Sequence, residues 1–293
     1  MRYLRPAAMV AASLVLLLAV DGTDVSAEAT TPVAAAAPRI RATVLSDRAG
    51  SPALRVRDQY AGAAFDACTA PPLDTLRAWR DASPYGALGI YTSGSQRGCA
   101  QPRLTADWVR QARAMGWRFL PVHVGLQAPC SELKSKPKKI DPARAVRQGR
   151  DEAAEAVRGL RAVGIGLGAP VFLDIEAYPL HDPACGQAVV DFALGWTQGL
   201  HAAGYRSGFY SSLDSGIADM AAAARAGSFP MPDTLWYARW DDHADTTTGG
   251  GALTPELWAD HQRVHQYHGN VEETYGGATL TVDRNQVDAP LAS

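Results

Sequence analysis

Short runs of β-branched, aromatic and small residues alternate with longer amphipathic runs from about residue 58 to residue 290. The short runs are typical of strands, and the amphipathic runs have the spacing of helices with one buried face. The pattern predicts strands at 61–67, 87–93, 118–127, 170–178, 206–212, 234–240, 263–269 and 279–287. It predicts helices at 72–82, 104–116, 141–164 and 187–204.

This order of elements predicts an α/β fold, a TIM-like (β/α) barrel of eight strands with helices reduced or missing in the last third. Helices follow roughly the first five strands, whereas only NVEETYGG separates the last two strands, which is too short for a crossover helix. An open, doubly wound sheet is the alternative. No glycine-rich phosphate loop follows the first strand, and this weakens the alternative.

The N-terminal segment has the pattern of a secretory signal peptide. Arg2 and Arg5 precede an apolar stretch at 7–20, and a small-x-small sequence, VSA, ends at Ala27. An apolar stretch of this length is short for a membrane span, although an uncleaved anchor is the alternative. We therefore expect a secreted or cell-envelope-associated protein without stable membrane insertion after cleavage. The expected segments are a signal peptide at 1–27, a flexible Ala/Pro-rich tether at 28–57 and a barrel domain at 58–290.

The composition is that of an ordinary globular protein, with 47% hydrophobic and 20% charged residues among 293. The net charge of −2 gives no reason to expect nucleic acid or an anionic membrane as a partner. We expect a monomer without a cofactor or a bound metal. His261, His265 and His268 would share one face of a helix, but VHQY is typical of a strand, where His265 and His268 point to opposite sides.

Four cysteines follow the first four predicted strands: Cys68, Cys99, Cys130 and Cys185. In an exported protein, four cysteines without a CxxC pair suggest two disulfides. Neighbouring loops favour Cys68–Cys99 and Cys130–Cys185, although three connectivities are possible. Such bridges would restrain the loops around the mouth of the barrel. General stabilisation of an exported protein, without a role in the site, is the alternative.

The segment PVFLDIEAY, 170–178, carries two acids in an otherwise apolar strand. Alternate residues of a strand face opposite ways, so Asp174, Glu176 and Tyr178 should face the barrel interior. The same test predicts further interior residues: Asp66, Tyr91, Ser93, His123, Gln127, Tyr210, Asp283 and Asn285. For the sixth strand, the pattern does not decide between two inward pairs, Tyr237 with Arg239 and Trp236 with Trp240.

Four acids are therefore expected at the C-terminal mouth of the barrel, where active sites of such barrels lie: Asp66, Asp174, Glu176 and Asp283. Like charges in a partly desolvated cleft cannot all stay ionised, so at least one carboxyl should have a raised pKa. A protonated carboxyl beside an ionised one is the pair that glycoside hydrolysis uses. Alternatives are ion pairing, with Arg239 as the only obvious interior cation, and a hard-metal site.

Aromatic residues near the same mouth are candidates for stacking on sugar rings: Tyr91, Tyr210, Trp236 and Trp240. Tryptophan and tyrosine also commonly fill barrel interiors, and this is the alternative for each of them.

The segments FDACTAPP, LDIEAY, LWYARW and HQYHGNVEETYGGATLTVDRNQVD resemble those of the bacterial secreted glycoside-hydrolase-like domain family, formerly a domain of unknown function, over about residues 58–288. That family is similar in layout to the muramidases of glycoside hydrolase family twenty-five. The resemblance implies that Glu176 is a general acid with Asp174 as its charged partner. It implies that Asp66 and Asp283 hold or activate water or the N-acetyl group of a substrate.

Pattern and resemblance together give the residues expected to contact substrate: Tyr91, His123, Gln127, Tyr178, Tyr210, Trp236, Arg239, Trp240, Gln266 and Asn285. We expect an exported protein that hydrolyses a cell-envelope polysaccharide, with peptidoglycan the most plausible. A non-catalytic glycan-binding protein is the alternative, favoured if the insert LQAPCSELKSKPKKI, 126–140, covers the mouth. A retaining, inverting or substrate-assisted mechanism depends on the carboxyl separation, which the sequence does not give.

Overall fold

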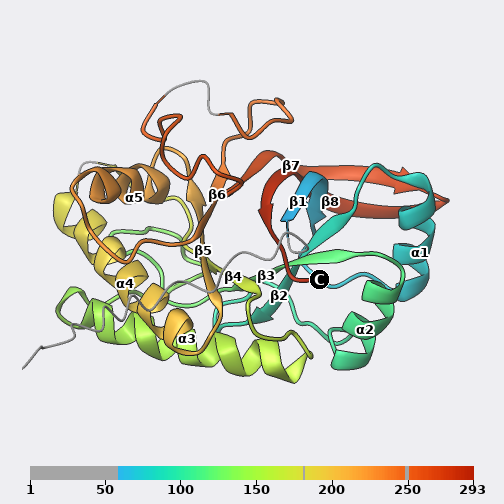
Figure 1. Cartoon of the computed structure of the whole chain (residues 1–293), viewed down its shortest axis with the longest axis horizontal. Helices are drawn as coiled ribbons and strands as arrows, with labels where there is room; N and C mark the ends of the chain where they lie inside the picture. Colours follow the sequence, from blue (N-terminus) through green and yellow to red (C-terminus); the bar gives the residue numbers. More distant parts are fainter. Residues whose placement is uncertain (1–58, 181, 248–250) are drawn as a thin grey trace, which may run out of the picture. The chain divides into compact units, whose positions relative to one another are not determined.

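The computed structural model describes residues 59–180, 182–247 and 251–293. Its eight strands form a closed barrel in chain order (Figure 1). The strands are β1 Gln59–Asp66, β2 Ala87–Ser93, β3 Arg118–His123, β4 Pro170–Asp174, β5 Arg206–Ser212, β6 Thr234–Ala238, β7 Arg263–Tyr275 and β8 Ala278–Pro290. The predicted fold class, a TIM-like barrel, is confirmed.

The strand β8 differs in direction from the others. Neighbouring strands from β1 to β7 are parallel, whereas β8 is antiparallel to both β7 and β1 and closes the barrel between them. Only Gly276 and Gly277, both with positive φ, connect β7 to β8. Such a two-residue connection forms a hairpin and cannot form a parallel crossover.

Five helices cover the outside of the barrel, one after each of the first five strands (Figure 1). They are α1 Leu73–Ala82, α2 Ala106–Ala114, α3 Ala145–Ala162, α4 Pro183–Ala202 and α5 Gly216–Arg225. α4 starts four residues before the predicted range because Asp182 caps it, accepting hydrogen bonds from the backbone N–H groups of Ala184 and Cys185. No helix occurs in the described part of the chain after α5, as the reduced last third predicted.

Two apolar layers are buried, one on each side of the sheet. Residues such as Phe65, Leu88 and Val171 pack between the barrel and its helices. Inside the barrel, Leu120, Phe172, Trp236 and several small residues form a second layer. The interior below the mouth is therefore filled with side chains, and the mouth lies above this layer.

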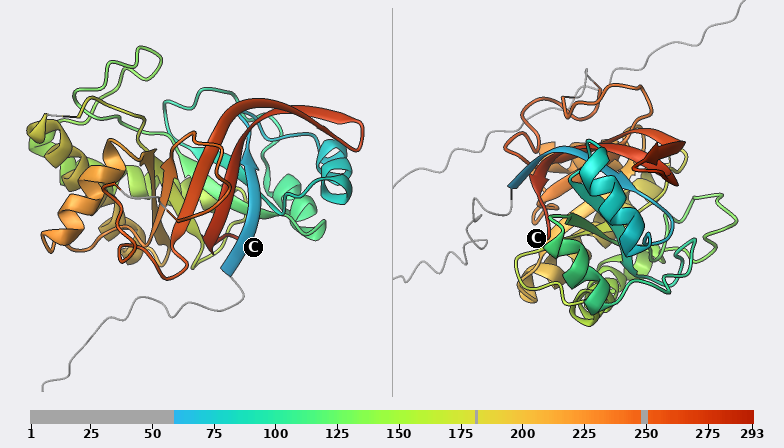
Figure 2. Two further views of the ribbon diagram at one scale, coloured as in Figure 1. Left: turned by 90° about the horizontal axis from the view of Figure 1, so that it is seen from above. Right: turned by 90° about the vertical axis from the view of Figure 1, so that its right-hand side faces the viewer.

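The β7–β8 hairpin runs past the barrel to α1, as the red strands show in Figures 1 and 2. Trp79 of α1 donates a hydrogen bond to the carbonyl of Ala278 at 2.8 Å, and its ring lies 5.1 Å from that of Tyr275. These contacts hold the far end of the hairpin. Its near part, which includes Asn270, Thr281 and Asp283, forms one wall of the mouth.

The predicted signal peptide and tether lie outside the described residues, so the segment boundaries stay predictions. No helix in the described part of the chain is long and apolar enough to cross a membrane.

Candidate functional site at the barrel mouth

A cavity of about 370 Å³ opens at the C-terminal ends of the strands. All four predicted acids line it, because Asp66 and Asp174 end β1 and β4, Glu176 follows β4, and Asp283 lies on β8. Five of the residues expected to contact substrate also line this cavity: Tyr91, Tyr210, Trp236, Trp240 and Gln266. Strand periodicity thus predicted that the four acids would line the cavity.

Asp66 lies at the base of the cavity and is only 3% exposed. Its two carboxylate oxygens accept hydrogen bonds from Asn285 Nδ2 at 2.8 Å, Tyr91 Oη at 3.0 Å and Gln266 Nε2 at 3.2 Å. Burial, and then the nearby charge of Asp283, raise the pKa of Asp66 to about 7, although these donors oppose the rise.

Asp283 shares a donor with Asp66. Gln266 Nε2 also lies 3.3 Å from Asp283 Oδ2, and the backbone N–H of Asn270 donates to Asp283 Oδ1. Burial raises the pKa of Asp283, as does the charge of Glu176. Two acids that contact one amide in a desolvated part of the cavity are suited to hold one proton between them.

Asp174 and Glu176 form the second pair of acids. Gln127 fixes the backbone between them: its Nε2 donates to the carbonyl of Asp174 and its Oε1 accepts from the N–H of Glu176, each at 2.8 Å. Burial, and then the charge of Glu176, raise the pKa of Asp174 to about 7. Asp174 Oδ1 is buried and has no hydrogen-bond partner among the described residues. It is therefore free to hold a proton or to accept one from a ligand.

Lys136 is a site residue that the pattern missed. Its Nζ lies 3.2 Å from Asp174 Oδ2 and also pairs with Glu176 Oε1. It comes from the insert after β3, and strand periodicity cannot place a loop side chain. A signal was present, because the insert carries four lysines, Lys134, Lys136, Lys138 and Lys139, next to an expected cluster of acids.

Aromatic rings form the floor and one side of the cavity. Trp236 resolves the choice left open for β6: it faces inward, with its ring 5.3 Å from that of Tyr210 and its Nε1 donating to Asn285 Oδ1. Trp240 is 59% exposed at the rim, and its Nε1 lies 3.2 Å from Gln266 Oε1. An exposed indole at the edge of an acidic cavity is a suitable surface for a sugar ring.

His123 and Ser93 do not face the interior, so their predicted orientation is wrong. His123 Nδ1 lies 2.8 Å from Ser93 Oγ, its Nε2 pairs with Glu152 of α3, and its ring packs against Trp196 of α4. A bulge after Tyr91 reverses the alternation at Ser93. On β3, both faces are buried, so apolar residues did not identify the outer face, and Val122 lines the cavity instead.

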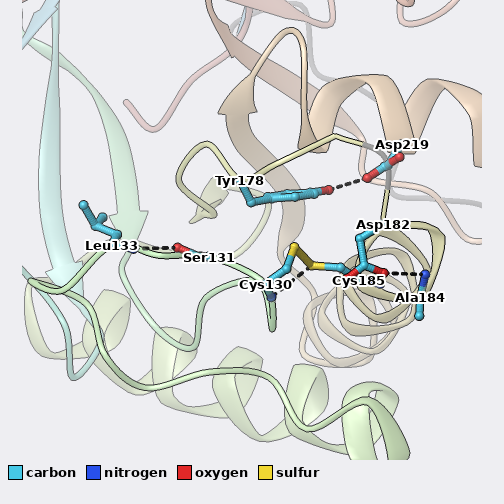
Figure 3. Close-up of a disulfide and its surroundings, with 8 residues drawn as sticks. All are labelled: Cys130, Ser131, Leu133, Tyr178, Asp182, Ala184, Cys185 and Asp219. Carbon is cyan, nitrogen blue, oxygen red and sulfur yellow. Dashed lines mark hydrogen bonds between the residues drawn. A yellow bond between two sulfur atoms is a disulfide. The ribbon is translucent and has the colours of Figure 1, made fainter.

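Tyr178 and Arg239 are also displaced from the cavity. β4 ends at Asp174, so its alternation does not extend to Tyr178, which turns outward and donates a hydrogen bond to Asp219 (Figure 3). Arg239 is half-exposed and pairs with Asp241. Among the described residues, the cation that lines the cavity is Lys136, so Arg239, the obvious interior cation of the ion-pairing alternative, does not line it.

Gln127 and Asn285 reach the site but do not line the open space. Both are fully buried. Gln127 holds the backbone of Asp174 and Glu176, and Asn285 links Asp66 to Trp236. Both residues therefore hold the acids in place through buried hydrogen bonds.

Both favoured disulfides are present, Cys68–Cys99 and Cys130–Cys185. Cys68 borders the cavity. The Cys130–Cys185 bridge ties the insert that carries Lys136 to the first turn of α4 (Figure 3). Within the described residues, no three His, Cys, Asp or Glu side chains are arranged to hold a metal ion.

The barrel and its acidic mouth define a glycosidase-like domain. The model of the Rv2525c-like, glycoside hydrolase-like domain matches residues 77–287, and the chain belongs to this family. The resemblance stated from the sequence is thereby confirmed. Among curated proteins, no sequence matches the chain significantly.

Solved structures share the fold at low sequence identity. An uncharacterized B. stearothermophilus protein is 19% identical with a TM-score of 0.53, over 77% of this chain and 95% of that one. The Mycobacterium tuberculosis Tat-secreted protein Rv2525c, solved with L-tartrate, is 17% identical with a TM-score of 0.52, over 79% and 99%. The modular autolysin LytC from Streptococcus pneumoniae is 13% identical with a TM-score of 0.50, over 78% and 46%.

Proposed function

We propose that this protein is exported and hydrolyses glycosidic bonds of a cell-envelope polysaccharide, with peptidoglycan the most plausible substrate. The observation that carries the proposal is the cavity itself, in which four carboxyl groups meet above an aromatic floor. Two of these groups, on Asp66 and Asp174, have pKa values of about 7. The site can thus hold protonated and ionised carboxyls together at neutral pH, as glycoside hydrolysis requires.

In this proposal Glu176 is the general acid and Asp174 its partner. The Glu176 side chain is 33% exposed and that of Asp174 is 6% exposed, so Glu176 is the one that a glycosidic oxygen can reach. Glu176 donates its proton to the leaving oxygen as the bond from that oxygen to the anomeric carbon breaks. The ionised neighbours stabilise the positive charge that develops on the sugar. Water supplies the hydroxyl of the new reducing end, and its remaining proton passes to a carboxylate of the site.

Asp66 and Asp283 would support this reaction from the opposite wall. Their shared contact with Gln266 places them to orient a water molecule or the N-acetyl group of the substrate. Trp240 at the rim would hold a sugar ring by stacking.

Two further observations support export and a role in the cell envelope. Both disulfides are of the kind found in exported proteins, and the predicted signal peptide precedes the barrel. LytC, which shares the fold, is described as an autolysin.

The test is the release of new reducing ends from purified peptidoglycan by the exported protein and its Glu176→Gln variant. We expect a loss of about 100-fold or more in the variant, because general acid catalysis contributes on this order. A matched control is Glu132→Gln, which changes an exposed acid of the insert that does not line the cavity. Equal release by Glu176→Gln and the parent would contradict the role of Glu176.

Glycan binding without turnover is a second candidate, favoured by the ion pairs between Lys136 and both Asp174 and Glu176. A protein with this function would bind peptidoglycan fragments but release no reducing ends, with or without Glu176.

A further inference from the structure

Lys136 is built into the acidic cavity although its chain segment is an insert. Its side chain is 12% exposed, and its ammonium group contacts Asp174 and Glu176 together. Among the described residues that line the cavity, it is the only cation. Most lysine side chains are exposed, so a largely buried lysine that contacts two acids indicates a specific role at the site.

The backbone around Lys136 is fixed at several points. Gln96 accepts a hydrogen bond from the N–H of Lys138 and donates one to its carbonyl. Gln127 pairs through its backbone with Lys138 and Ile140. The disulfide at Cys130 ties the start of the insert to α4 (Figure 3). Lys136 is therefore presented by an anchored loop.

The other charged side chains that line the cavity with Lys136 are acidic, while the ammonium group of Lys139 donates a hydrogen bond to the Lys136 carbonyl. Asp174 and Glu176 come from the end of β4, while Asp66 of β1 and Asp283 of β8 lie across the cavity. The neutral hydroxyls of Tyr91 and Tyr210 complete the wall. A positive charge in contact with a carboxyl favours its ionised form. Lys136 thus opposes the protonation of Asp174.

We propose that Lys136 is a positioning residue for this site: its ammonium group holds the carboxyl groups of Asp174 and Glu176 in place and favours the ionised form of Asp174 against the effect of its burial. The inference rests on the proposed function for its meaning in catalysis. Its physical content, the control of the charge of Asp174, does not require activity.

The effects of Lys136 and the two acids on one another support this assignment. The charges and hydrogen bonds of Asp174 and Glu176 raise the pKa of Lys136 against the effect of its burial. In return, Lys136 opposes the effect of burial on the pKa of Asp174. Removal of the ammonium group would leave burial and the mutual repulsion of the two acids uncompensated.

The first test is the pH dependence of reducing-end release by Lys136→Met, which keeps the apolar stem and removes the charge. Asp174 is the charged partner of the acid, so activity is gained as the pH rises through the titration of Asp174. Without Lys136, we expect this low-pH limb to move upward by about one pH unit or more. Lys136→Arg should keep the parent limb, and Lys134→Met, an exposed lysine of the same insert, is the matched control.

The second test does not depend on activity. Carbon-13 NMR of the Asp and Glu carboxyl groups, recorded against pH, should show the Asp174 carboxyl of Lys136→Met titrating above its parent value of about 7. Lys136→Gln serves as a second uncharged variant if Lys136→Met is poorly folded.

The two tests separate the inference from the proposed function. An upward shift of the Asp174 titration in a protein that releases no reducing ends would support the role of Lys136 and would contradict hydrolysis as the function. An active protein whose pH limb and carboxyl titration are unchanged in both uncharged variants would overturn the role of Lys136. A loss of activity without a shift would also overturn it, because that is the effect of a merely structural contact.

Discussion

Asp66 and Asp174 are buried carboxyl groups at the ends of two strands, and each has a pKa of about 7. Burial is the largest cause for both, and a second acid adds to it: Asp283 for Asp66 and Glu176 for Asp174. Such costly placement is typical of functional sites.

The raised pKa of Asp66 predicts how stability changes with pH. The folded protein keeps a proton on Asp66 up to about pH 7, whereas the unfolded chain releases it near the ordinary value of 3.8. The contribution of Asp66 to the free energy of unfolding therefore falls as the pH rises between these values, by about 1.4 kcal/mol per pH unit at most. Asp66→Asn removes this loss, so its stability relative to the parent should increase from pH 4 to pH 7.

Urea unfolding of both proteins at several pH values checks this prediction. Asp214→Asn, which changes an exposed acid, should follow the parent at every pH. Parallel curves for Asp66→Asn and the parent would show that Asp66 titrates normally in the folded state.

The sequence predicted the positions of the individual acids better than the positions of the residues around them. Asp66, Asp174 and Asp283 are strand residues with apolar neighbours, so alternation placed them correctly. His123 was misplaced because both faces of β3 are buried, and Tyr178 because β4 ends before it. Lys136 could not be placed, since the path of a loop depends on tertiary contacts such as those of Gln96.

The contact between β7 and the loop after β6 shapes the rim of the cavity. Trp240 lies so close to Gly269 of β7 that a β-carbon at this glycine would be 2.1 Å from the indole atom Cζ2. The position of the exposed ring therefore requires glycine at residue 269.

Gly269→Ala should displace Trp240 and weaken glycan binding about five- to tenfold, because aromatic contacts contribute on the order of 1 kcal/mol. Titration calorimetry with a soluble peptidoglycan oligosaccharide measures the effect. Gly166→Ala is the control, since a β-carbon there meets no atom within 4 Å. Unchanged affinity in Gly269→Ala would mean that Trp240 does not contact the glycan.

The elements themselves were largely predictable. Hydrophobic periodicity identified all eight strands and four of the five helices, because each buries one continuous face. The alanine-rich α5 carries too little contrast between its faces. The length of β7 and β8 was underestimated, because the outer half of the hairpin, as at Glu272 and Thr274, is polar and is held by α1.

The whole chain combines a common fold, the (β/α) barrel, with a mouth that carries four acids. The order of elements and the short connection between β7 and β8 are sufficient to predict a barrel that ends in a hairpin. The candidate site combines side chains from all eight strands and one insert, and no local sequence pattern contains their joint geometry. The family match identifies a glycoside hydrolase-like domain, and a solved structure shares its fold.

The central claim is that the mouth cavity takes a glycan, and calorimetry with Glu176→Gln tests it most directly. This variant should bind a peptidoglycan oligosaccharide of alternating N-acetylglucosamine and N-acetylmuramic acid without consuming it. We predict binding of one oligosaccharide per chain, weakened about tenfold or more when Trp240→Ala is added, since Trp240 stands at the rim. No binding, or equal binding with and without Trp240, would contradict the assignment of this cavity as the glycan site.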